Sequence, residues 1–272
     1  MNKVPQESYG SFTSKNANKV LSDSAKQVMH SGYTILDSGI SKKDINLISD
    51  SLRELQKEYT KKYGKEILIS AEENNILRMP MAFNKIFLDL AFNKQLINII
   101  SELIEGQFLL NQQNALFNVP HEKYSQARWH RDLPYQHFTT SKPIAISGLF
   151  CVDDFTTQNG ATYILPQSHK EEWIPGDDLI KQSAVQIEAS SGQFIVMDSM
   201  AFHSGGINHS SIERRAINHV FTIPFFKHQI DLHSELKKYD LSCFQKQVLG
   251  FKHLTPSSLN EFFQSKIKKN KI

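Results

Sequence analysis

Apolar residues recur at helical spacing in the N-terminal third of the chain. Between about residues 42 and 62, four of them lie three and four positions apart, which predicts a helix with one buried face. They are Ile45, Ile48, Leu52 and Leu55. Ser41 stands directly before this stretch, where its hydroxyl can cap the first turn, so we expect the helix to begin there.

Three further stretches have a helical pattern. A short helix over residues 24–30 is closed by Gly32 and followed by a strand over residues 33–36. A second amphipathic helix is expected from about Asn84 to Leu103, and the tail from about Ser242 to Lys268 returns to helical spacing. These helices therefore flank a middle region of a different kind.

From residue 108 onward the pattern changes to alternation and short β-rich runs. The runs are 108–119, 144–152, 161–165, 185–187, 193–197 and 216–224, and turn residues such as Asn159-Gly160 and Ser190-Ser191-Gly192 separate them. Short strands without intervening helices are typical of a sandwich or jelly roll. The sequence thus predicts a mainly β protein with flanking α-helices.

At this length one large β domain with helical additions is as reasonable as two ordinary domains, and we expect one. Residues 1–20 are polar and irregular, and we interpret them as an N-terminal arm. Residues 21–272 then form a single domain. Its parts are a helical flank at about 21–105, a β core at about 106–228 and a helical tail at about 229–272.

Composition and charge exclude several classes of protein. The chain has 272 residues, of which 40% are hydrophobic, and its formal charge of +3 is too small and too evenly spread to indicate a nucleic-acid-binding protein. No stretch approaches the 18 apolar residues of a membrane span, and the N-terminus has no apolar export signal. We therefore expect a cytoplasmic protein without membrane insertion. The two cysteines fit a reduced compartment, and the pattern specifies no oligomeric state.

Histidine and acidic side chains two residues apart on a strand point to the same face, where both can reach one metal ion. His130-Arg131-Asp132 has this pattern, but so have His169-Lys170-Glu171 and His233-Ser234-Glu235. With 11 histidines and 28 acidic residues, chance alone gives about one such pair. The pattern by itself does not choose among the three.

A facial iron site of two histidines and one carboxylate needs a third ligand and leaves metal positions open for substrate and oxygen. His203 follows a predicted strand through a turn, as a ligand at the mouth of a barrel would, and Arg214 stands eleven residues later. The pair at His233 has no arginine after it, because Arg215 is the last arginine of the chain. The pair at His169 could still use His203 as a third ligand, but it lies in a loop-like sequence, which favours a histidine at the surface or one that supports a ligand.

The arginines gather near these candidates. The chain has only six arginines, and four of them lie close to the candidate ligands: Arg128, Arg131, Arg214 and Arg215. Arginine presents a planar fork that binds a carboxylate through two parallel hydrogen bonds. In a strand, Arg214 and Arg215 would point to opposite faces, one inward and one into solvent.

Taken together, these motifs resemble the phytanoyl-CoA dioxygenase family. The motifs that carry the resemblance occur in the family's order: Trp129-His130-Arg131-Asp132-Leu133, Tyr135-Gln136-His137-Phe138, Asn159-Gly160-Ala161, Leu165-Pro166-Gln167-Ser168-His169-Lys170, His203-Ser204-Gly205-Gly206-Ile207-Asn208 and Arg214-Arg215-Ala216. They cover about residues 105–226. Any one of them alone would be weak, but the set is specific.

The resemblance implies a double-stranded β-helix (jelly roll) that binds Fe(II) through His130, Asp132 and His203. It further implies that 2-oxoglutarate chelates the metal with its far carboxylate on Arg214, and that O2 is consumed as the oxoacid is decarboxylated to succinate. Family members usually have glutamine where Arg131 stands, and this side chain should point away from the metal by strand alternation. Some relatives are halogenases, in which a small residue replaces the aspartate; because Asp132 is present, hydroxylation is the expected reaction.

Residues that contact the substrate are less well specified. Gln112, Asn114 and Asn118 share one face of a predicted strand and could line the barrel, although a solvent-facing edge would give the same pattern. A second group could form a pocket wall or belong to the ordinary core: Trp129, Tyr135, His137 and Phe138.

Two hypotheses follow from the sequence. The first is an Fe(II)- and 2-oxoglutarate-dependent dioxygenase that hydroxylates a small organic molecule, which would be its partner. The second is a cupin-like metal-binding jelly roll, sugar-binding or isomerising, without oxygenase activity. Arg214 separates them, because only the oxygenase needs to bind an oxoacid. No separate phosphate-binding cluster supports an acyl-CoA substrate, so acyl chains, sugars and amino-acid derivatives all stay open.

Overall fold

The computed structural model describes residues 21–122, 126–133 and 139–269. The expected arm at residues 1–20 lies outside them. The helices described are α1 (Asp23–Ser31), α2 (Lys42–Tyr63), α3 (Lys65–Ser70), α4 (Lys85–Ala91), α5 (Lys94–Leu103), α6 (Asp177–Ser183), α7 (Leu232–Leu236), α8 (Cys243–Val248) and α9 (Leu259–Lys269), with single 3-10 turns at Pro80–Ala82 and Ser168–Lys170. In this part of the chain no helix is long and apolar enough to cross a bilayer.

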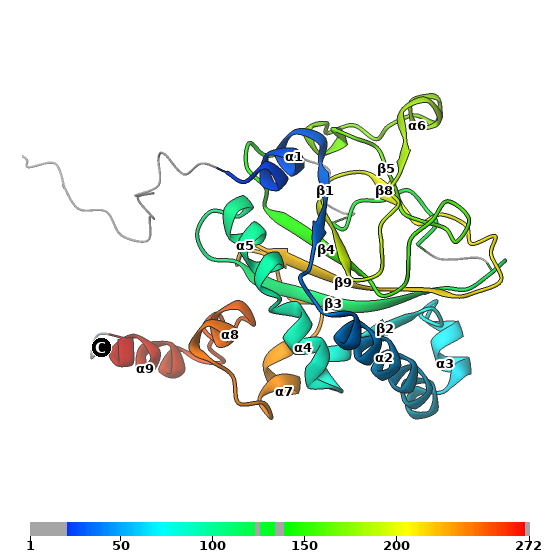
Figure 1. Ribbon diagram of the computed structural model, residues 1–272. Helices are drawn as coiled ribbons and strands as arrows, with labels where there is room; N and C mark the ends of the chain where they lie inside the picture. Colours follow the sequence, from blue (N-terminus) through cyan, green and yellow to red (C-terminus); the bar gives the residue numbers. More distant parts are fainter. Residues whose placement is uncertain (1–20, 123–125, 134–138, 270–272) are drawn as a thin grey trace, which may run out of the picture.

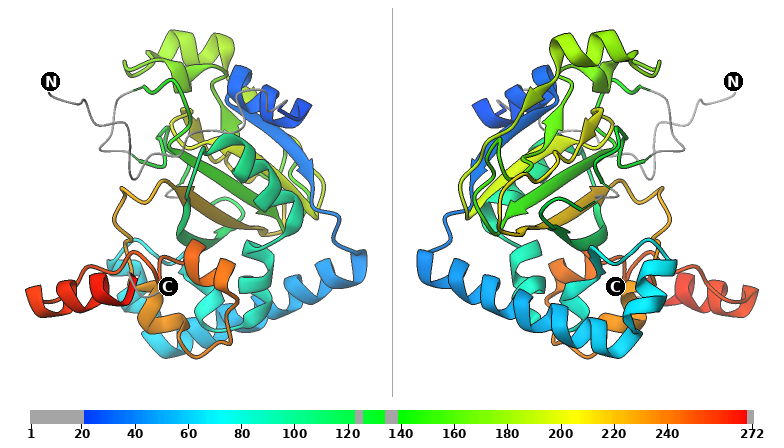
Figure 2. Two further views of the ribbon diagram at one scale, coloured as in Figure 1. Left: turned by 90° about the vertical axis from the view of Figure 1, so that its left-hand side faces the viewer. Right: turned by 90° about the vertical axis from the view of Figure 1, so that its right-hand side faces the viewer.

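The strands form two antiparallel sheets. They are β1 (Tyr33–Asp37), β2 (Ile76–Arg78), β3 (Leu109–Asn118), β4 (Ala145–Cys151), β5 (Tyr163–Ile164), β6 (Val185–Gln186), β7 (Gln193–Asp198), β8 (His203–Ser204) and β9 (Arg214–Thr222). The larger sheet has the order β1-β7-β4-β9-β3-β2, and the smaller one has the order β6-β5-β8. Helices α2, α4 and α7 lie together on one side of the larger sheet, and α9 projects from the molecule near the end of the chain (Figures 1 and 2).

Alternation along the strands of the larger sheet separates two apolar clusters. On β4, Ile146 and Phe150 belong to the cluster shared with the helices, whereas Leu149 and Cys151 belong to the cluster that also contains Ile164 of the smaller sheet. Successive side chains of a strand point to opposite faces, so β1, β3, β4, β7 and β9 each contribute to both clusters. One face of the larger sheet is thus covered by helices and the other faces the smaller sheet.

The N-terminal elements agree with their sequence pattern. The side chain of Ser41 accepts a hydrogen bond from the backbone N–H of Asp44, and the predicted apolar face of α2 is buried. Helix α1 ends at Gly32, whose φ of 91° is the left-handed conformation that glycine adopts most easily, and β1 follows at once. These predictions are confirmed.

Two predicted helices are interrupted. The prediction of one helix from Asn84 to Leu103 is wrong, because this stretch forms two helices, α4 and α5. The Asn93 side chain accepts hydrogen bonds from the backbone N–H groups of Gln95 and Leu96 and so starts a new helix. The tail is divided into α8 and α9. Gly250, with φ of 79°, lies just after α8, and a proline follows before α9.

A buried histidine lies between the larger sheet and the helices. His219 of β9 is 0% exposed, and its Nδ1 lies 3.0 Å from the carbonyl oxygen of Gly148 on β4. Burial lowers the pKa of His219 from its ordinary value of 6.5 to about 4. The ring is therefore neutral in the folded protein near pH 7.

We expect the His219 ring to make stability depend on pH. The unfolded chain binds a proton at His219 more tightly than the folded protein does. Protonation of His219 therefore leaves the free energy of unfolding unchanged above pH 6.5 and lowers it as the pH falls toward 4, by on the order of 3 kcal/mol. The free energy of unfolding of the wild type and of His219→Gln can be measured with urea at several pH values. The value for the wild type minus that for the variant should decrease as the pH is lowered from 6.5 to 4. The comparison removes the opposing effect of Asp198, whose pKa burial raises to about 7. A difference independent of pH would contradict the prediction.

Candidate metal centre

Two histidines that are far apart in sequence lie directly opposite each other in the structure. The backbone N–H of His130 donates to the carbonyl of His203 at 2.9 Å, and the N–H of His203 donates back at 3.0 Å. Such a reciprocal pair places both side chains on the same face of an antiparallel ladder. Their ring centroids are 4.4 Å apart.

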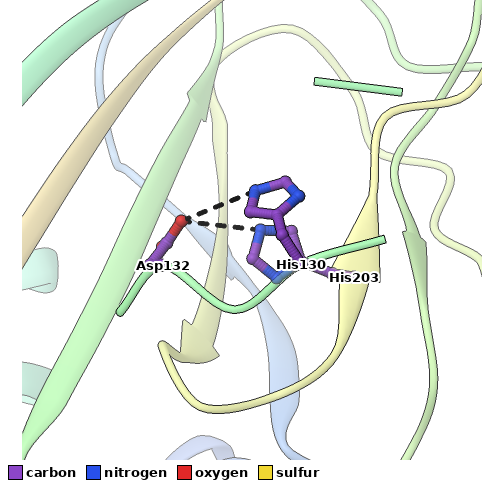
Figure 3. A group of neighbouring side chains, drawn as sticks. All are labelled: His130, Asp132 and His203. Carbon is purple, nitrogen blue, oxygen red and sulfur yellow. Dashed lines mark ion pairs between the residues drawn. The ribbon is translucent and has the colours of Figure 1, made fainter. Parts of the chain in front are cut away.

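Asp132 completes a group of three side chains. Its Oδ1 atom lies 3.9 Å from Nε2 of His130 and 3.6 Å from Nε2 of His203, and Figure 3 shows the carboxylate facing both rings. The three possible ligand atoms all lie within 4.8 Å of one another. Among the described residues, these three are the histidine, cysteine or acidic side chains that lie close enough together to hold a metal ion.

The backbone orients both imidazole rings. Nδ1 of His130 lies 2.7 Å from the carbonyl oxygen of Arg128, and Nδ1 of His203 lies 2.9 Å from that of Ala201. In a neutral ring Nδ1–H donates to this carbonyl, which leaves the lone pair on Nε2 facing Asp132. Burial, and next the neighbouring His130, lower the pKa of His203 and favour the neutral ring that a metal requires.

The triad opens into a cavity of about 40 Å³ between the two sheets. Arg214 of β9 lines the same cavity, together with apolar side chains of β3, β4 and β7. The lining residues are Leu116, Gln126, His130, Asp132, Leu149, Thr162, Met197, His203, Gly205, Arg214 and Asn218. The three side chains of the triad and the guanidinium of Arg214 thus share one small cavity.

Arg214 is held by the predicted turn at Asn159-Gly160. Its guanidinium is buried, lies 4.1 Å above the ring of Phe155, and donates from one terminal nitrogen to the carbonyl of Gly160 at 2.9 Å. Gly160 has φ of 78°, and a Cβ there would lie 2.4 Å from the carbonyl oxygen of Gly206. Only glycine fits at this position, so the turn is part of the support of Arg214.

Arg215 points to the opposite face, but the expectation that it lies in solvent is wrong. Its Nε and one terminal nitrogen donate to the two carboxylate oxygens of Asp153 at 2.9 and 2.7 Å, and it also bonds to Ser49 of α2. Alternation gives the direction of a side chain but not what lies there. Here helix α2 packs against the strand, and Arg215 is buried between its partners Ser49 and Asp153.

We expect Arg215→Ala to lower the free energy of unfolding by about 2 to 3 kcal/mol. Removing one partner of a buried pair leaves an uncompensated charge, and we take a value below the fully buried case because Asp153 keeps 29% side-chain exposure. Urea unfolding followed by circular dichroism measures it. Arg53→Ala is the control, since its pair with Asp50 is exposed and should cost less than about 1 kcal/mol. Equal stability of the two variants would refute this expectation.

Arg131 points away from the triad, as predicted, although the expected strand at residues 130–132 is only an isolated bridge at His130. Its side chain is 1% exposed, and one terminal nitrogen donates to the carbonyls of Ser168 at 3.2 Å and Glu171 at 2.5 Å. These carbonyls belong to the loop that follows β5. Arg131 therefore joins the segment that carries His130 and Asp132 to the Leu165–Lys170 motif, and it does not line the cavity.

The other candidate residues occupy different places. Gln112 and Asn114 have amide groups 3.0 Å apart and border a separate cavity of about 10 Å³, while Leu116 of the same strand face lines the metal cavity. Asn118 is fully buried and donates to the carbonyl of Gly206 at 2.8 Å. Trp129 stacks on Phe202 with ring centroids 5.5 Å apart.

Three of the aromatic candidates, Tyr135, His137 and Phe138, lie outside the described residues. Of the two alternative histidine pairs, His169 is buried with Nε2 3.3 Å from the carbonyl of Met29, and His233 packs its ring against Phe251. Neither belongs to the group of three side chains that lie close enough together to hold a metal ion. The sequence did not point to Thr162, Met197 or Asn218 as cavity residues, because only the pairing of distant strands brings them there.

Comparison with known proteins identifies the family. The family model described as phytanoyl-CoA dioxygenase (PhyH) matches residues 29–216, a range that holds the triad and Arg214. The chain belongs to the phytanoyl-CoA dioxygenase family. The resemblance seen in the sequence is thus confirmed over more than half of the chain.

This member of the phytanoyl-CoA dioxygenase family is similar in sequence to a mycobacterial protein and in fold to two solved structures. Protein Rv1501 of Mycobacterium tuberculosis is 27% identical over 241 residues, which are 86% of this chain and 88% of Rv1501. The fold matches EctD from S. alaskensis, solved with 2-oxoglutarate and 5-hydroxyectoine, at TM-score 0.65 and 17% identity over 75% and 76% of the two chains. It also matches iron-bound HygX from Streptomyces hygroscopicus at TM-score 0.59 and 12% identity over 79% and 92%.

Proposed function

We propose that this chain is an Fe(II)- and 2-oxoglutarate-dependent dioxygenase that hydroxylates a small organic molecule and converts 2-oxoglutarate to succinate. One observation carries the proposal: His130, Asp132, His203 and Arg214 line one cavity, with both histidine Nε2 atoms turned to the carboxylate. Membership in the phytanoyl-CoA dioxygenase family supports it. So does a fold shared with structures that hold iron or 2-oxoglutarate.

The donor set fits iron. Two neutral imidazole nitrogens and one carboxylate oxygen on one side of an ion are typical of non-haem Fe(II) oxygenases, because they leave the other positions open. His130, Asp132 and His203 would hold the ion, and bound iron would supply the oxygen chemistry. The presence of Asp132 favours hydroxylation, since the halogenases of the family lack a carboxylate there.

The protein's own groups bind and orient the other reactants. Arg214 would hold the far carboxylate of 2-oxoglutarate with its fork, and the Phe155 ring and the Gly160 carbonyl keep that fork in place. The apolar side chains of Leu116, Leu149 and Met197 line part of the same space. The chain would thus position its reactants within one small cavity.

The two facing antiparallel sheets also support a finer proposal for the fold. We infer a double-stranded β-helix core at about residues 106–228, with a helical flank at about 21–105 and a helical tail at about 229–272, in a single oxygenase domain. The short strands β5, β6 and β8 then form one half of the roll, and β8 carries His203.

A panel of substrates tests the proposed function. Succinate release should be measured with acyl-CoA esters, sugars and amino-acid derivatives, in the presence of Fe(II), 2-oxoglutarate and isotopically labelled O2. A substrate should stimulate succinate release and gain one labelled oxygen atom. A substrate that stimulates succinate release without gaining oxygen would contradict hydroxylation but would still agree with a 2-oxoglutarate-dependent oxygenase. Iron-loaded protein that releases no succinate with any class would contradict the proposal.

A further inference from the structure

Two buried serines lie behind the carboxylate of Asp132. The hydroxyl of Ser147, on β4, donates to Oδ2 of Asp132, the oxygen other than the one that faces the histidines. The hydroxyl oxygens of Ser147 and Ser199 are 2.7 Å apart. Both serines are 0% exposed, so water does not compete for these bonds.

Ser199 also holds the main chain of Asp132. The backbone N–H of Asp132 donates to the carbonyl of Ser199 at 2.9 Å, and the N–H of Ser199 donates to the carbonyl of Ala145 at 3.0 Å. Ser199 follows β7, and Ala145 begins β4. The backbone and the carboxylate of Asp132 are therefore both tied to the larger sheet through the same two serines.

The direction of the hydrogen bonds follows from charge. An ionised carboxylate only accepts hydrogen bonds, so Ser147 must use its single proton on Asp132. Its oxygen is then free to accept, and the proton between the two serines must come from Ser199. The chain of donors runs from Ser199 to Ser147 to Asp132, an order in which each bond strengthens the next.

We propose that Ser147, supported by Ser199, is a positioning residue for the metal site. The terminal torsion of an aspartate is broad and nearly two-fold, so a free carboxylate would turn its oxygens easily. With Oδ2 held by Ser147, Oδ1 stays 3.6 Å from Nε2 of His203 and 3.9 Å from Nε2 of His130. The inference rests on the proposed function only in requiring that the triad bind Fe(II).

The test is the Fe(II) affinity of Ser147→Ala, measured without oxygen by competition with a coloured chelator. Loss of a group that orients a metal ligand typically weakens metal binding 10- to 100-fold, and we expect a loss in that range. The absorption spectrum of the Co(II)-loaded protein should change as well, because the ligand geometry changes. Neither measurement requires turnover.

Ser199→Ala and Thr222→Val complete the design. Ser199→Ala should weaken Fe(II) binding by about threefold, the effect of one neutral hydrogen bond, and should add nothing in the Ser147→Ala background. Thr222→Val is the matched control, since Thr222 is a fully buried residue of the same sheet whose hydroxyl has no partner in the described part of the chain. It should leave Fe(II) affinity unchanged.

Clear outcomes would overturn the inference. Folded Ser147→Ala with Fe(II) affinity within twofold of the wild type shows that the hydroxyl does not position the carboxylate. A merely structural role would lower the unfolding temperature and leave the metal affinity and the Co(II) spectrum alone. If Ser147→Ala does not fold, unchanged affinity in Ser199→Ala overturns the inference instead. A wild type that fails to bind Fe(II) would overturn the proposed function along with it.

Discussion

His203→Ala is expected to abolish turnover and to weaken Fe(II) binding by more than about 100-fold, beyond the effect of losing a group that only orients a ligand. One of three protein ligands is lost, and the remaining His130 and Asp132 leave the ion held by two groups. Equilibrium dialysis without oxygen gives the affinity, and circular dichroism checks the fold. His130→Ala and Asp132→Ala should behave in the same way.

His209→Ala is the matched control for this loss. His209 lies in the loop that follows His203, is exposed, and does not belong to the triad of His130, Asp132 and His203. It should keep the wild-type iron affinity, and His233→Ala should retain substantial turnover. If His169→Ala removed iron binding while Asp132→Ala did not, the choice of histidine pair would be mistaken.

Arg214→Lys is expected to weaken 2-oxoglutarate binding by roughly 10- to 100-fold while Fe(II) affinity changes little. Lysine keeps the charge but loses the second parallel bond of the fork, and a charge-assisted hydrogen bond is worth about 1.5 to 3 kcal/mol. The stacking of the guanidinium on Phe155 is lost too. Anaerobic titration of the iron-loaded variant with 2-oxoglutarate measures the effect.

Arg215→Lys provides the comparison at the neighbouring position. Its side chain lies on the far side of β9 from the cavity, so 2-oxoglutarate affinity should stay near that of the wild type. Stability should fall, because lysine cannot reproduce the paired bonds to Asp153. A large loss of 2-oxoglutarate affinity in Arg215→Lys with none in Arg214→Lys would show that the wrong arginine had been assigned.

Local pattern predicted the long elements well. The spacing of apolar residues placed α2, and alternation in β9 separated Arg214 from Arg215, because both depend on the geometry of one element. The break between α4 and α5 was missed because Asn93 can sit inside a helix or cap one, and only tertiary packing decides. The short strands β2 and β8 depend on distant partners and have little pattern of their own.

The site was predictable only where neighbours in sequence are also neighbours in space. The spacing of His130 and Asp132 predicted that both side chains face one metal ion, but the pairing of His130 with His203 is a contact between distant segments that no local rule specifies. Family resemblance supplied that link. The burial of Arg215 beneath α2 and the role of Ser147 behind Asp132 had no comparable signal, since a lone serine in an apolar strand is uninformative.

The central claim is that the triad and Arg214 together bind iron and 2-oxoglutarate. The most direct measurement adds 2-oxoglutarate to the anaerobic Fe(II)-loaded protein and follows the metal-to-ligand absorption band of a chelated oxoacid. We predict that the band appears with the wild type and saturates at one equivalent, and that Arg214→Lys needs a higher 2-oxoglutarate concentration. Iron-loaded, folded wild type without this band would contradict the account and favour a cupin-like metal-binding protein without oxygenase activity.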